Sequence, residues 1–255
     1  MNVFLGFAGS LLLFLFVVVP LLNRRQAARD AAAVKQFGDQ ATALGLQHQG
    51  AVAQTGQVQL SGQSEGVAWT ARVHARLGTS GRGSRRAESS LITFPGLVAA
   101  PGTFVLAMAL PPGTQLPPEP ELGKSDGGFL ASLAEKASEA LLDLCVSGYF
   151  GAEHRALVNS AGSARPPGPP GFWILSTDAA LAARLLDARG QELLVSLKDA
   201  EVAQGRTLAS TGFGVLATPA GLLLGCQAGL IEPARLKFIA DRGARLVAHA
   251  AAPGK

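Results

Sequence analysis

Two short segments of the chain have spacings that resemble catalytic or phosphate-binding motifs. Segment 225–229, GCQAG, has the outline of a nucleophile elbow with Cys226 in the nucleophile position. A cysteine nucleophile needs a histidine base that a third group orients, and nothing nearby in the sequence supplies one. Segment 123–125, GKS, ends like a phosphate-binding loop, but Pro118 replaces the glycine whose N–H would wrap the phosphate. We therefore interpret the first segment as a strand end with a small buried thiol and the second as part of a linker.

Metal-ligating and acid–base side chains show no recognisable spacing. The histidines are His48, His74, His154 and His249, and the cysteines are Cys145 and Cys226. No pair among them has the separation of a zinc motif, so we expect no cofactor and no metal. The sequence therefore favours a protein that is not an enzyme. One alternative stays open: a membrane-tethered hydrolase with a non-contiguous active site, for which the candidate residues are Cys226 and either His74 or His154.

Basic side chains gather in two regions, which are the candidate contact sites. Arg24, Arg25, Arg29 and Lys35 follow an apolar N-terminal stretch and are interpreted as membrane-proximal cations. A second group is a candidate contact for an anion or an acidic partner: Arg72, His74, Arg76, Arg82, Arg85 and Arg86. For residues 72–76 an ordinary solvated strand face is the favoured interpretation, while for residues 82–86 an idle hairpin tip explains the basic side chains equally well. The net charge of +4 comes without a basic groove interleaved with aromatic residues, so nucleic acid is not an expected partner.

Residues 3–22 form an unbroken apolar stretch, and the first charged side chain after it is Arg24. About 20 apolar residues in a helix span a bilayer, and the stretch is too long and lacks the basic start of a cleavable signal peptide. Because the basic residues lie only on its C-terminal side, we expect the N-terminus outside and the soluble domain in the cytoplasm. The sequence thus predicts a single-pass inner-membrane protein that contacts the lipid bilayer through residues 3–22.

The elements that follow predict an α+β fold. The expected parts are an anchor (1–23), a helical stalk (24–45), an antiparallel β region (46–110), a proline-rich linker (111–127) and an α+β region (128–255). In the β region, apolar and polar residues alternate over 67–77, which is typical of a half-buried strand. Strands over 57–60, 67–77, 89–94 and 103–110 are expected to follow one another in a meander, and a further short strand is expected at 155–159.

The C-terminal part is predicted to contain a hairpin around 219–221 and a closing helix over 233–250. Whether residues 46–110 and 128–255 share one core stays open at this level. The layout resembles uncharacterised bacterial proteins with one N-terminal anchor and a cytoplasmic α+β domain, on the strength of residues 5–25 and 213–250. This resemblance implies no role for any individual residue.

These observations favour a non-catalytic interaction module over an enzyme. A stalk, rigid loops rich in glycine and proline, and the lack of a catalytic motif are typical of a scaffold or an accessory subunit of a membrane protein complex. The expected partner is another membrane protein or a second copy of the chain, recruited through a sheet edge or an exposed loop.

Overall fold

The structure, a computed structural model, describes residues 18–52, 57–74, 89–96, 101–109, 146–159, 164–203, 205–227 and 231–252. Its main strands are β1 (Gln47–Val52), β2 (Gln57–Ser64), β3 (Val67–His74), β4 (Ser90–Phe94), β5 (Val105–Ala109), β6 (Phe172–Ser176), β9 (Phe213–Thr218) and β10 (Gly221–Cys226). Its helices are α2 (Val19–Ala43), α4 (Arg155–Asn159), α5 (Ala179–Leu185), α6 (Ala188–Lys198), α7 (Leu208–Thr211) and α8 (Pro233–Ala251). A short 3₁₀ helix, η2 (Ala152–His154), precedes α4, and β7 (Glu201–Ala203) pairs with β8 (Arg206–Thr207) in a small separate sheet.

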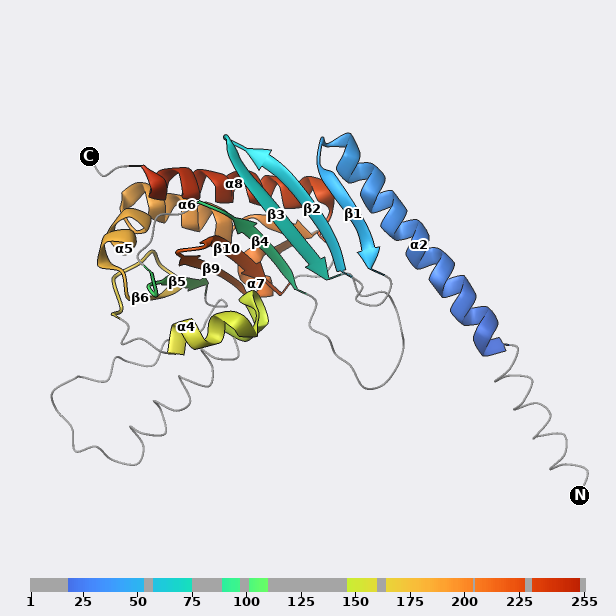
Figure 1. Ribbon diagram of the computed structural model, residues 1–255, viewed down its shortest axis with the longest axis horizontal. Coiled ribbons are helices and arrows are strands. Elements are labelled where there is room, and N and C mark those ends of the chain that lie inside the picture. The colour runs from blue at the N-terminus through green and yellow to red at the C-terminus, as the bar shows by residue number, and fades with distance from the viewer. Residues whose placement is uncertain are drawn as a thin grey trace, which may run out of the picture.

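The eight main strands form one antiparallel sheet in the order β1-β2-β3-β4-β10-β9-β5-β6, and α8 closes the chain (Figure 1). The predicted α+β class and C-terminal helix are confirmed. The expected hairpin around 219–221 joins β9 to β10, with Thr218 paired to Gly221. Segments before and after the proline-rich stretch both contribute strands to this sheet, since β10 pairs with β4 and β9 pairs with β5.

Strands β2, β3 and β4 are consecutive neighbours, as the meander requires. Trp69, Ala71 and Val73 of β3 are buried while the residues between them are exposed, which is the predicted alternation. The expected place of β5 is wrong, because β10 and β9 lie between β4 and β5. Both inserted strands are buried at every residue. Strands that are apolar on both faces need a partner at each edge and a covering layer on each side, so they occupy the middle of the sheet.

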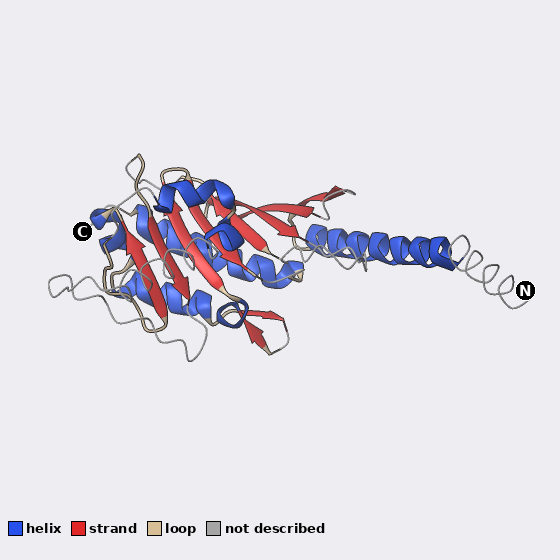
Figure 2. Cartoon of the chain, turned by 90° about the horizontal axis from the view of Figure 1, so that it is seen from below, coloured by secondary structure: helices blue, strands red, loops and turns tan. Residues whose placement is uncertain are grey.

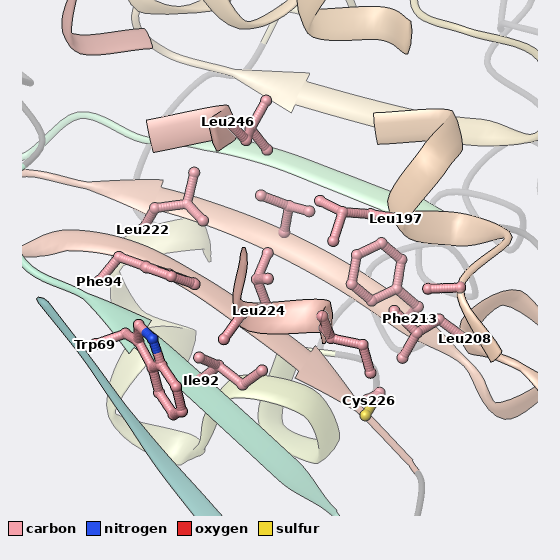
Figure 3. Close-up of a cluster of buried hydrophobic side chains, with 14 of the residues drawn as sticks. Trp69, Ile92, Phe94, Leu197, Leu208, Phe213, Leu222, Leu224, Cys226 and Leu246 are labelled. Atoms are coloured by element: carbon pink, nitrogen blue, oxygen red, sulfur yellow. The ribbon is translucent and has the colours of Figure 1, made fainter. Parts of the chain in front are cut away.

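The sheet separates two apolar layers. On one side α5, α6 and α8 pack on the larger core, part of which Figure 3 shows around Phe94, Leu222 and Leu246. On the other side the helical segment 146–150 and α4 pack on a smaller core. Alternate residues of β5 supply the two sides: Val105, Ala107 and Ala109 the larger core, Leu106 and Met108 the smaller one. The expected strand at 155–159 is wrong, since this segment forms α4.

A chain of hydrogen bonds that starts in the core fastens the β2–β3 hairpin to α8. Trp69 is 1% exposed, and its indole Nε1 donates to Ser64 Oγ at 3.0 Å. The Ser64 hydroxyl in turn donates to the carboxylate of Asp241 on α8. Lys237, one helical turn earlier, donates to both oxygens of this carboxylate at 3.2 and 3.0 Å. The chain satisfies the one polar atom of the buried tryptophan, which would otherwise cost free energy on burial.

The predicted membrane anchor falls largely on residues 1–17, which lie outside the described residues. The helix that is described, α2, has Asn23, Arg24 and Arg25 within its first two turns, and charged side chains are costly in hydrocarbon. Among the described residues no helix is both long and apolar enough to cross a bilayer. The predictions of a single transmembrane helix and of an inner-membrane location with the N-terminus outside are therefore wrong.

Candidate functional site

Helix α2 is the most unusual feature of the described chain, because most of it stands clear of the body. It has 25 residues, a length of about 37 Å at the usual helical rise. Figures 1 and 2 both show it extending away from β1 toward the N-terminus. Where burial along α2 is described, only Phe37, Gly38 and Ala41 are buried. We refer to its first part, residues 19–33, as the arm.

The base of α2 is held by a tight C-terminal turn. Gly45 has a φ of 73°, in the left-handed region that favours glycine. The N–H of Gly45 donates to the carbonyl of Thr42 at 2.9 Å, and the N–H of Leu46 donates to that of Ala41 at 3.0 Å. This hydrogen-bond pair is a Schellman motif, and its usual apolar contact is supplied by Leu46 and Ala41, which are both buried. The motif fixes the direction in which α2 leaves β1.

A close contact between α2 and β1 adds to this rigidity. A Cβ atom built on Gly38 would lie 2.7 Å from Cε1 and 2.8 Å from Nδ1 of His48, so the imidazole rests directly on the helix backbone. The ring of Phe37 lies 6.3 Å from the same imidazole, centroid to centroid. His48 Nε2 is buried and has no hydrogen-bond partner among the described residues. Gly38 and His48 are not among the predicted site residues, and a glycine inside a helical pattern is the only sequence signal for this contact.

The arm presents polar and apolar side chains to solvent. Arg24 and Arg25 are exposed, as is Lys35 nearer the base of the helix. Arg29 also lies on α2, but the structure does not describe its side chain. Within the described residues, four large apolar side chains are exposed: Leu21, Leu22, Leu44 and Phe238. Three of these four lie on α2 or directly after it. The predicted basic group of the stalk is thus placed on the arm and toward the base of the same helix.

The second predicted basic group is described only in part. Arg72 is exposed on β3, where it pairs with Gln59 of β2 and Leu91 of β4. His74 is the last residue of β3 and its side chain is not described. Arg76, Arg82, Arg85 and Arg86 lie outside the described residues. The proposed row of anion-binding side chains therefore stays a prediction.

Cys226 lies at the end of β10 and is buried in the apolar core (Figure 3). The cavity beside it has a volume of about 10 Å³, which leaves room for one water molecule at most. The described residues that line this cavity are mainly apolar and include no histidine. A substrate therefore has no described space in which to meet the thiol, and sequence reasoning correctly interprets Cys226 as buried.

A larger cavity, of about 470 Å³, lies between segment 164–167 and α5. Its described walls are alanine, proline and leucine side chains with Ser176, Thr177 and Gln191. None of these lining residues titrates near neutral pH, so the described walls of the cavity offer no general acid or base. Across the described residues, no three His, Cys, Asp or Glu side chains come together in a way that could hold a metal ion.

Polar side-chain contacts fasten both ends of α8 to neighbouring elements. Near its start, Arg235 Nη1 lies 2.9 Å from Glu201 Oε1, and this guanidinium lowers the pKa of the Glu201 carboxyl. Near its end, His249 Nε2 lies 2.8 Å from Asp187 Oδ1. The pKa of Asp187 is lowered, mainly because the N–H of Gly190 donates to its carboxylate at the start of α6, and also by His249. These contacts hold α8 to β7 at one end and to the start of α6 at the other, and among the described residues they form no catalytic arrangement.

Comparison with models of protein families, with curated proteins and with solved structures finds no match for this chain.

Proposed function

We propose that this protein is a non-catalytic interaction module that presents the arm of α2 to a partner protein. The observation that carries the proposal is the placement of Leu21 and Leu22, which are 52% and 55% exposed on a helix that stands away from the body. Large apolar side chains grouped on a protruding element are typical of surfaces that are covered in a complex. A scaffold or an accessory subunit is the class of protein that this geometry favours.

The arm is able to remain helical before it meets a partner. Segment 27–33, AARDAAA, is rich in alanine, the residue with the highest intrinsic helix propensity. Most helices in proteins nevertheless gain their stability from packing of one face, and the arm has no such packing within the described residues. A partner that covers the arm would supply it. Because the base is fixed by Gly38 and the turn at Gly45, binding requires little reordering of the helix.

The charge of α2 indicates what the partner surface is like. The helix carries four basic residues, namely Arg24, Arg25, Arg29 and Lys35, against Asp30 and Asp39. A partner with an acidic face that also offers an apolar contact for Leu21 and Leu22 would complement it. A second copy of the chain would have to place like charges together, so we favour a different protein as partner.

The proposal is tested by capturing partners from the native cell extract with the full chain and with two charge-reversed variants. Arg24→Glu with Arg25→Glu alters the arm, while Arg165→Glu with Arg206→Glu makes the same charge change on the body, where both arginines are exposed. We expect the arm variant to lose a partner that the unmodified chain and the body variant both retain. Circular dichroism of each variant checks that the fold is intact.

Three results would count against the proposal. Capture of no defined partner by the unmodified chain would contradict its role as an interaction module. Equal retention by both variants would show that the arm is not the binding surface. Equal loss from both would show that the capture depends on net charge alone.

A further inference from the structure

A groove with a volume of about 460 Å³ runs between α6 and α8. Its lining comes from residues 189, 192, 193 and 196 of α6 and residues 238, 241, 242 and 245 of α8. Each set follows the i, i+3, i+4, i+7 spacing that places residues on one face of a helix. Arg242 contacts Ser196 and His249 contacts Asp187, so the two helices run antiparallel with these faces toward each other.

Arg242 occupies a fixed position in this groove. Its Nε donates to Ser196 Oγ at 2.7 Å, and its Cζ lies 3.6 Å from the centroid of the Phe238 ring. The ring and the hydroxyl together orient the guanidinium. Its remaining N–H groups, on Nη1 and Nη2, have no hydrogen-bond partner among the described residues, and these two nitrogens form the fork that binds a carboxylate through two parallel hydrogen bonds.

Among the described residues that line the groove, Arg242 is the cation that has no carboxylate partner. Arg189 pairs with Glu192 at 2.8 Å, and Arg245 pairs with Glu65 at 3.2 Å. Asp241, the other acidic residue of the groove, pairs with Lys237. Burial lowers the pKa of Arg242, and the nearby Arg245 lowers it further. In the part of the groove that the structure describes, Arg242 is thus a half-buried positive charge without an ion-pair partner, which an incoming anion would stabilise.

We propose that the α6–α8 groove binds an acidic segment of a partner protein, with one carboxylate on the Arg242 fork and an apolar neighbour on Phe238. Phe238 is 46% exposed, so it offers an aromatic surface directly beside the cation. A small inorganic anion would use the charge and leave the ring uncovered. The inference does not depend on the arm, because none of the α2 residues whose side chains are described lines the groove.

The test is binding of a fluorescently labelled acidic octapeptide of glutamate and phenylalanine to the full chain, followed by anisotropy. Arg242→Gln should weaken binding by about tenfold, the usual effect of losing a charge-assisted hydrogen bond. Arg242→Lys keeps the charge but loses the fork. Its affinity for the peptide should therefore lie between that of the unmodified chain and that of Arg242→Gln. Phe238→Ala should weaken binding by several fold, whereas Arg206→Gln, an exposed arginine elsewhere, should change it by less than about twofold.

Several outcomes would overturn the inference. Equal weakening by Arg242→Gln and Arg206→Gln would mean that only net charge attracts the peptide. Full affinity in Arg242→Gln, or no binding by the unmodified chain, would exclude the groove as the site. Competition by glutarate at the same concentration as the peptide would show that a free small carboxylate, rather than a protein segment, is the ligand. Urea unfolding of each variant separates loss of binding from loss of fold.

Discussion

Gly38 is a position where alanine should destabilise this protein, although alanine is normally the best helix former. The added Cβ would lie 2.7 Å from Cε1 of His48, closer than carbon atoms approach without a shift. The imidazole has little room to move, because Phe37 lies beside it and His48 belongs to a paired strand. Alanine at residue 38 therefore must push α2 and β1 apart or displace the ring.

Two opposing effects determine the size of the change. Replacing glycine by alanine inside a helix favours the folded state by about 1 kcal/mol. Adding a methyl group to a tightly packed contact usually costs about 1–3 kcal/mol. We therefore expect Gly38→Ala to lower the free energy of unfolding by about 0–2 kcal/mol. Because this range includes zero, the single substitution is a weak test. A second measurement is needed in a protein that lacks the His48 imidazole.

His48→Ala provides that background in a double-mutant cycle. Without the imidazole, Gly38→Ala should stabilise the protein by about 1 kcal/mol, because only the helix-propensity gain remains. The interaction between the two substitutions should then be about 1–3 kcal/mol. Urea unfolding of the four proteins gives these values, and Gln36→Ala, at an exposed position of the same helix, should stay within about 0.5 kcal/mol of the parent.

Additive changes would refute this account of the base of α2. If Gly38→Ala stabilises the protein equally with and without His48, then the helix does not rest on the imidazole and its direction is not fixed by this contact. A large change in the denaturant slope would instead show that the unfolded or native state had changed in compactness.

Three further predictions concern the body. Ser64→Ala removes the acceptor of the buried Trp69 indole N–H and should lower the free energy of unfolding by about 1–3 kcal/mol. Asp187→Ala removes the side chain that caps α6 and should cost about 1 kcal/mol at neutral pH, whereas Asp187→Asn, which keeps a capping oxygen, should cost less. Gly243→Ala places a Cβ 2.5 Å from Cζ of Phe94, and the overpacking should cost about 1–3 kcal/mol against a propensity gain of about 1 kcal/mol. Urea unfolding measures all three.

The Asp187 variants also predict a pH dependence. The folded protein lowers the pKa of this carboxyl from its usual value near 3.8, so the carboxylate stabilises the fold above that pH. The contribution is lost as the pH falls through the folded pKa. The stability difference between the parent and Asp187→Asn should therefore shrink below about pH 3.8, and a constant difference would contradict the assignment.

The other two variants have their own contrary results. For Ser64→Ala, it is a stability equal to that of Ser61→Ala on the same strand. For Gly243→Ala, it is a gain in stability.

Local patterns in the sequence predicted the elements with strong periodicity or turn chemistry. Strand β3, the β9–β10 hairpin and helix α8 all follow from such patterns. Strand β1 was missed because its sequence, QHQGAV, has no alternation and contains a glycine. The insertion of β9 and β10 between β4 and β5 depends on long-range pairing, for which only their unbroken apolar character was a signal.

The candidate sites were harder to predict than the fold. The basic residues of α2 were identified from the sequence, but the interpretation attached to them, a membrane-proximal stalk, rested on an anchor that the described helices do not support. The groove around Arg242 could not be identified, because its two helical faces meet only after α6 packs on α8. A stripe such as 238, 241, 242 and 245 looks like an ordinary solvated helix face until its neighbour is known.

Site-specific photo-crosslinking in the native cell tests the central claim, that the arm of α2 is a partner-binding surface, most directly. A benzoylphenylalanine at position 24 places the reactive group on the arm, and one at Ala180 places it on an exposed position of α5. The account predicts a defined crosslinked partner from position 24 and none from position 180. The same products from both positions, or none from position 24, would contradict it.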